Sequence, residues 1–142
     1  MQFKVTKPLS DVKAARLAEL QAAYASLTKG IDPATGKHIY VDCVVGGQTY
    51  RMNAGETAAQ RMDAGIRLAQ EVGWQDVPIV RDFHNQNHNN VPLALAKLIR
   101  NQQAQHALGI WAQKGQLTDQ INACATIQDV RAVVLNFPVA TE

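Results

Sequence analysis

Two histidines four residues apart, His84 and His88, are the first candidates for a metal site in this sequence. Imidazole nitrogens are common zinc ligands, and Asp82 stands nearby as a third potential ligand. On a helix this spacing would put both rings on one face. Here the histidines stand among Asn and Gln residues, which are typical of a solvated turn. We expect a turn that binds no metal or other cofactor.

The other residue types that carry out catalysis are scattered. His38 and His106 are isolated, and the only serines, Ser10 and Ser26, fall in one predicted helix, so the sequence predicts no hydrolase triad. Gly46-Gly47 stands between two strand-like runs, without the strand-to-helix glycine pattern or the lysine of a phosphate-binding loop. We therefore predict that the protein is not an enzyme.

The two cysteines, Cys43 and Cys124, fit no metal or redox spacing. Two readings are open for them. Each can pack as a small apolar residue in a reducing compartment, or the two can form a disulfide. We expect packing.

Composition restricts the classes of protein that the chain can belong to. With 142 residues, 46% hydrophobic, it is long enough for a single domain over residues 1–142. A net charge of +2 with scattered basic residues does not predict nucleic-acid binding. No apolar run is long enough to span a membrane and no signal-peptide pattern opens the chain, so we expect an intracellular protein when it is made.

The first part of the chain predicts an arm and a helix. Residues 1–8 can form an edge strand or arm, because Met1–Val5 alternates weakly before Pro8. A helix is expected from the N-cap Ser10 to about Thr28. Its apolar stripe, Leu17, Leu20, Tyr24 and Leu27, can pack within the domain or form the seam of a short coiled coil with a sister chain.

Two hairpins and further helices follow. Residues 38–45 and 48–52 are strand-like around the Gly46-Gly47 turn, and residues 55–72 predict a helix that ends at Gly73. The central segment, Val77–Trp111, predicts a second hairpin that leads into the longest helix near Pro92. We place a helix boundary at Lys114-Gly115, then one short helix to Cys124 and a last one from Thr126 to Pro138.

These elements predict an α+β fold, with about four to five helices and one or two short antiparallel β-hairpins. The two apolar stripes of the long helix, with four polar residues, 100–103, between them, are not quite in register, so its halves should face different neighbours. The amides of residues 101–105 can hydrogen-bond across a subunit interface or form an exposed helix face. One core is expected, built from Leu20, Ile39, Val41, Tyr50, Met62, Ile66, Leu95, Leu98, Leu108, Trp111, Ile121 and Val130.

Protein contacts are the remaining way for such a chain to act. Aromatic side chains dominate the centres of protein interfaces, so the residues expected to contact a partner are Tyr24, Trp74, Phe83 and Trp111.

With the elements in order, the chain over residues 9–137 resembles a phage domain family of unknown biochemical activity. That family is found at the carboxy terminus of many tail-fibre and tail-associated proteins of tailed bacteriophages and prophages. Three loose motifs carry the resemblance: residues 47–50 followed by a helix with Arg61 and Ile66, residues 80–83 with 89–93 before a helix, and residues 121–126 with Val130.

The resemblance implies a non-enzymatic structural protein of a phage tail, a tail-fibre or fibre-attachment component whose partners are other phage tail proteins. It would be made in the bacterial host cytoplasm and carried in the virion tail. A homotrimer is the expected oligomer if the chain belongs to a fibre. Two alternatives stay open: a tail-fibre assembly chaperone absent from the virion, and a small phage protein that binds and inhibits a host protein.

Overall fold

The computed structural model describes residues 7–142 and has an α+β fold. The strand expected at Met1–Val5 lies outside the described residues. Within them, four helices and five short strands follow one another as α1 (Leu9–Thr28), β1 (Ile39–Val45), β2 (Gln48–Asn53), α2 (Glu56–Val72), β3 (Asp76–Arg81), β4 (Asn87–Pro92), α3 (Leu93–Ala123), α4 (Ile127–Ala132) and β5 (Ala140–Thr141).

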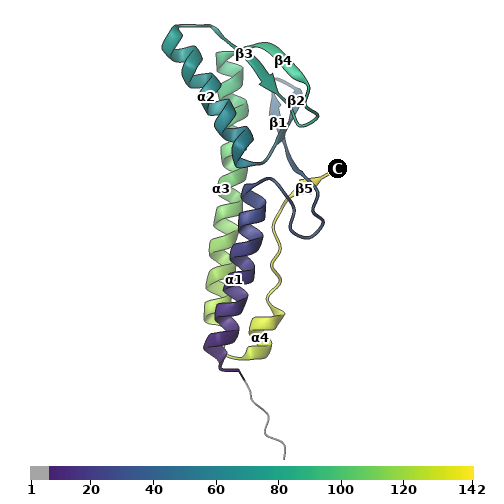
Figure 1. Ribbon diagram of the computed structural model, residues 1–142, viewed down its shortest axis with the longest axis vertical. Helices are drawn as coiled ribbons and strands as arrows, with labels where there is room; N and C mark the ends of the chain where they lie inside the picture. The colour runs from purple at the N-terminus through teal and green to yellow at the C-terminus, as the bar shows by residue number, and fades with distance from the viewer. Residues whose placement is uncertain (1–6) are drawn as a thin grey trace, which may run out of the picture.

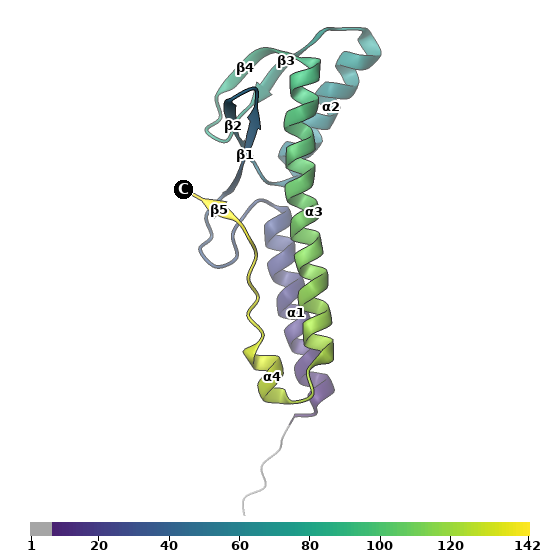
Figure 2. The ribbon, with the colours of Figure 1, turned by 180° about the vertical axis from the view of Figure 1, so that it is seen from behind.

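Helix α3 is the axis of the molecule (Figure 1). Its first half packs against α2 and the strands β1, β3 and β4, and we call this part the hairpin end. Its second half packs against α1, and α4 packs on α1; we call this part the helical end. Figure 2 shows from behind that the segment after α4 returns along the helices to β5, near the middle of the molecule. None of the helices in residues 7–142 is long and apolar enough to cross a membrane.

The continuity of α3 corrects the predicted boundary at Lys114-Gly115. A glycine inside a helix costs only about 1 kcal/mol relative to alanine. Buried Ile110 and Leu117 lie on one stripe on either side of Gly115, and their packing continues through that position. The third and fourth helices expected along the chain are therefore one, which gives four helices, within the predicted range of four to five.

Both predicted hairpins are present. Gly46 and Gly47 have positive φ angles of 57° and 78°, as a two-residue hairpin turn requires, and they join β1 to β2 in antiparallel register. Strands β3 and β4 form a separate antiparallel pair. The sequence did not predict β5, whose two residues pair with the other edge of β1 to give the order β2-β1-β5.

Helix ends follow local signals in part. α2 ends at Gly73, which is left-handed, and the Thr126 hydroxyl accepts a hydrogen bond from the Asp129 N–H at 3.0 Å, as predicted. The predicted Ser10 cap is wrong, because α1 begins at Leu9 after Pro8. α4 ends at Ala132, well before Pro138, and Phe137 is buried in the helical end from the segment that follows.

The core consists of two clusters, where the sequence predicted one. At the helical end the buried residues are Val12, Leu20, Leu27, Ile39, Ile110, Leu117, Ile121, Val130 and Phe137. At the hairpin end they are Cys43, Met52, Met62, Ala69, Val77, Val80, Val91, Ala96 and Ile99.

Three predicted core residues, Leu98, Leu108 and Trp111, are exposed instead, at 48%, 63% and 60%. The buried stripe of α3 runs through Ile99 and Ile110. Leu108 lies nearly opposite that stripe, whereas Leu98 and Trp111 lie on its two flanks, because neighbouring residues are about 100° apart around a helix. The other predicted core residues are buried or pack in part against one of the two clusters.

Candidate functional site

The turn between β3 and β4 is organised by the carboxylate of Asp82, which is only 8% exposed. Its Oδ1 accepts hydrogen bonds from the backbone N–H groups of His84 at 2.9 Å and Gln86 at 3.0 Å, and its Oδ2 lies 2.9 Å from His88 Nε2. Asn85 has a φ of +60°, which asparagine tolerates better than most residues. The Asn-rich sequence therefore serves a tight turn.

Burial and hydrogen bonding act in opposite directions on Asp82. Burial, the largest single influence, raises its pKa, but the hydrogen bonds from His88 and from the backbone of Gln86 and His84 together outweigh it. The pKa of Asp82 therefore lies below the ordinary value of 3.8. Asp82 is a structural anion that holds the turn.

The two histidines point to different carboxylates. His84 Nε2 lies 2.7 Å from Glu142 Oε1, whereas His88 is bonded to Asp82. In residues 7–142, no group of three or more His, Cys, Asp or Glu side chains is placed to hold a metal ion.

Phe83 belongs to a network that joins the two sheets. Its backbone N–H donates to the Arg51 carbonyl at 2.8 Å. Its ring makes an edge contact with the Tyr40 ring, and the centroids of the two rings are 5.7 Å apart. The Arg51 guanidinium lies 3.7 Å from the centre of the Tyr40 ring and donates to Asp42 and Glu142, both at 2.9 Å. Phe83 is therefore tied into a structural contact and is only partly exposed.

Neither cysteine is in a disulfide, so the packing interpretation is the one the structure shows. Cys43 is fully buried, and its thiol donates weakly to the Ile99 carbonyl at 3.6 Å. Burial raises the pKa of Cys43 to about 11, which keeps it a neutral thiol at physiological pH.

Trp74 is 44% exposed and lies just beyond α2, in the hairpin end. Leu68 and Val72, four residues apart on α2, are also about half exposed. Among the described residues, the other exposed large apolar residues of the hairpin end are Val44, Ile79 and Leu98. Leu68 and Val72 are placed on one face by their spacing.

A more continuous surface lies along the α1–α3 pair. Exposed residues recur on both helices at spacings of three and four, which places them on one stripe of each helix. We call this surface the α1/α3 face; it consists of Ala14, Ala18, Gln21 and Ala25 on α1 and Ala104, Leu108, Trp111 and Gly115 on α3. None of these residues is charged.

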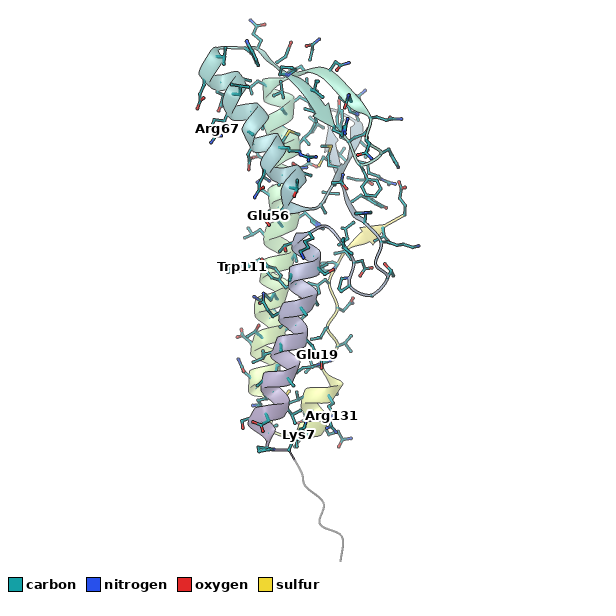
Figure 3. All side chains as sticks on the ribbon, viewed as in Figure 1. Lys7, Glu19, Glu56, Arg67, Trp111 and Arg131 are labelled. Carbon is teal, nitrogen blue, oxygen red and sulfur yellow. The ribbon has the colours of Figure 1, made fainter. Side chains whose placement is uncertain are left out.

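The contact between Tyr24 and Lys114 shows that both stripes border the same side of the helix pair. The Lys114 ammonium lies 4.5 Å from the centre of the Tyr24 ring, across the seam between the helices. The opposite side is covered by the C-terminal segment, where Gln113 donates to the Asn136 carbonyl at 3.1 Å. Figure 3 shows Trp111 on the side away from that segment.

Of the four predicted contact residues, the structure therefore brings two together. Tyr24 and Trp111 flank the same seam, with Lys114 between them. Trp74 lies in the other end, and Phe83 is held in the network between the sheets. The sequence missed the small residues of α1, whose signal is the recurrence of alanine at positions 14, 18, 22 and 25.

No protein-family model matches the chain, and no curated protein or solved structure matches it either. The function must therefore be argued from the surfaces of this structure.

Proposed function

We propose that the protein acts without catalysis, by binding another protein through the α1/α3 face. One observation carries this proposal: Leu108 and Trp111, three residues apart on α3, are both at least 60% exposed. Burying a large apolar side chain is favourable by roughly 1.5–3 kcal/mol relative to leaving it exposed to water. A partner that covers both Leu108 and Trp111 would gain this free energy at each of them.

The rest of the face suits a close contact with a helix or an apolar loop. The small alanine side chains on both helices, and Gly115 on α3, let a partner's backbone approach. Trp111 supplies the large, rigid contact that interface centres favour. None of the eight residues of the face is charged, so covering them desolvates no ion; Lys114, between Tyr24 and Trp111, and Asp119, beside Trp111, lie at its edge.

The phage-tail setting of this proposal comes from the family resemblance. In that setting the partner is another tail protein, and the chain is a tail-fibre or fibre-attachment component. A sister chain is the alternative occupant of the face. The chaperone and the host-directed inhibitor use the same kind of surface, and purified virions distinguish them: a structural component is present in stoichiometric amounts, whereas the other two are absent.

The mass of the protein in solution, alone and co-expressed with a neighbouring tail protein, tests the proposal. We expect an assembly that Trp111→Ser weakens at least tenfold, because a central tryptophan typically contributes more than about 1.4 kcal/mol to binding.

Trp74→Ser is the matched control, since Trp74 is also a partly exposed tryptophan but lies in the hairpin end. It should leave the assembly unchanged. A chain that is monomeric under both conditions, or an assembly that survives Trp111→Ser, would contradict the proposal.

A further inference from the structure

Gln103 is an anomaly in the middle of α3. It lies on the buried stripe between Ile99 of one core cluster and Ile110 of the other, and it is only 5% exposed. Neither its Nε2 nor its Oε1 has a hydrogen-bond partner among the described residues. Buried carboxamides are nearly always paired, because an unpaired one loses its hydrogen bonds to water without compensation.

The neighbouring residue shows what a carboxamide does when it is paired. Gln102 Oε1 accepts from the backbone N–H of Val44, and Gln102 Nε2 donates to the Val44 carbonyl, both at 2.8 Å. One backbone amide edge thus gives both polar atoms of the carboxamide a partner. Gln103 has the same carboxamide donor and acceptor one position further along α3, but it lies on a different side of the helix from Gln102.

Gln103 lines a cavity of about 300 Å³ where the two ends of the molecule meet. The cavity is bounded by the last turn of α1, the first turn of α2 and the middle of α3. Its apolar wall includes Leu27, Ala59 and Ile110, and His106 lies on the α3 side beside Gln103. This volume is at the lower end of the range for small-molecule pockets and suits a single ring.

Of the charged groups that line this cavity, Arg100 is paired within the protein and Glu56 is exposed to solvent. The Arg100 guanidinium donates to both carboxylate oxygens of Asp63, at 2.6 and 3.1 Å. Glu56 accepts a hydrogen bond from Gln60 at 3.4 Å. Burial lowers the pKa of His106 below 6.5, which leaves a neutral ring at pH 7. An uncharged ligand therefore fits better than an ion.

The first turn of α2 forms part of the same wall. Its N-cap is Gly55, which has no side chain to accept from the first N–H groups of the helix. Gly55 and Glu56 both line the cavity.

From the unpaired carboxamide and the cavity that it lines, we propose that this protein has a small-molecule site at the junction of its two ends. Its ligand is a small, uncharged, planar molecule with an N–H donor next to a carbonyl acceptor, a carboxamide or lactam edge that pairs with Gln103 as Val44 pairs with Gln102. This inference does not rest on the α1/α3 face, because none of the eight residues of that face lines the cavity.

Nuclear magnetic resonance titration of the full chain with nicotinamide and with uracil tests the proposal. We expect at least one of the two probes to shift the side-chain amide signals of Gln103 at millimolar concentrations or below. N,N-dimethylnicotinamide keeps the ring but lacks the N–H donor, so its affinity should be at least tenfold weaker than that of nicotinamide if nicotinamide binds. The outcome that overturns the proposal is no shift at Gln103 with either probe up to about 10 mM, or equal binding of the dimethyl compound.

Two matched variants distinguish a ligand-binding role of Gln103 from a purely structural one. Gln103→Met removes the unpaired groups, so it should abolish probe binding and raise the midpoint of thermal unfolding by a few degrees. Gln102→Met breaks the pairing with Val44, so it should lower that midpoint while probe binding persists. A Gln103→Met protein as destabilised as Gln102→Met would show that the Gln103 amide is already satisfied in the free protein, and would overturn the site.

Discussion

At the helical end the buried side chains are mostly Leu and Ile with one Phe, whereas at the hairpin end they are Val, Ala, Met and Cys with a single Ile. Large aliphatic side chains from α1, α3 and α4 interdigitate at the first end. Smaller or more flexible side chains fill the second, where backbone ladders between strands fix the geometry.

The polar interactions divide in the same way. Arg51, Asp82 and the residues bonded to them all belong to the strands and turns near the hairpin end or to the final residue. The helical end has the exposed pair between Arg16 and Glu19, and Arg16 also donates to the Val133 carbonyl. One end therefore depends on apolar packing and the other on hydrogen bonds and ion pairs, so different perturbations should affect each.

The largest effect is expected from a cavity at the helical end. Leu20 is 1% exposed, and Leu20→Ala should lower the free energy of unfolding by about 2–5 kcal/mol. Chemical denaturation measures the total, and amide hydrogen exchange should show greater loss of protection in α1 and α4 than in the β3–β4 hairpin. Leu108→Ala is the control, because that leucine is exposed and its loss should cost less than about 1 kcal/mol. Equal loss of protection at both ends would mean that the two clusters open as one unit.

The joint between the ends is the next most sensitive place. Gly30 has a φ of +77°, and an added Cβ would lie 2.8 Å from the backbone nitrogen of Gly55. Gly30→Ala should therefore cost about 2 kcal/mol or more, from the left-handed backbone and from the displaced start of α2.

Gly36→Ala separates these two causes. Gly36 has a φ of +72° but nothing within 4 Å of its added Cβ, so it should show only the backbone cost of about 1–2 kcal/mol. Thermal unfolding of the two variants measures the difference. Equal destabilisation would show that the contact between Gly30 and Gly55 is unimportant.

Acid should weaken the hairpin end before the helical end. The Arg51 hydrogen bond is the largest cause of the lowered pKa values of Asp42 and Glu142, and the pKa of Asp82 is lowered as described above. Each group binds a proton more readily when the chain is unfolded. The stability it contributes is therefore present above its unfolded pKa, 3.8 for Asp or 4.5 for Glu, and is lost as the pH falls through the folded value.

Hydrogen exchange between about pH 5 and pH 3, corrected for intrinsic rates, measures this effect in β1–β4 relative to α1. Arg51→Gln should reduce the acid sensitivity, because Asp42 and Glu142 lose the partner that lowers their pKa values. An unchanged difference between the two ends would assign the acid sensitivity to Asp82 or to other groups.

The smallest effect is expected at α4. Thr126→Ala removes the hydroxyl that accepts from the Asp129 N–H, and should cost about 0.5–2 kcal/mol at most, confined to the helical end. Thr126→Ser keeps the acceptor and should restore most of the loss in thermal unfolding. Failure of the serine variant to do so would assign the effect to the lost methyl group.

Local chemistry made several features predictable. Gly46-Gly47 can adopt positive φ at low cost, Gly73 ends α2, and Thr126 caps α4, since each of these depends on residues a few positions apart. The α+β class and both hairpins follow from the same kind of signal. The mismatch in register between the two apolar stripes also indicated correctly that the two halves of α3 have different neighbours.

The side of α3 that is buried was not predictable in the same way. Ala104, Leu108 and Trp111 form as good a stripe at helical spacing as the buried residues do, and the buried stripe is interrupted by the polar residue Gln103. Periodicity alone cannot choose between two apolar faces of one long helix. The candidate site was half predicted for that reason: Tyr24 and Trp111 were named, but Trp111 was also assigned to the core.

By itself, the sequence determined the two hairpins and most of the helices, because those choices are made by neighbouring residues through backbone geometry and hydrogen bonding. Only the tertiary structure decided which face of α3 is covered, that two cores form in place of one, and that β5 returns to β1. These depend on contacts between residues far apart in the chain, such as Ile39 with the helical end and Gln102 with Val44. Many such arrangements are compatible with the same local preferences, and packing selects among them.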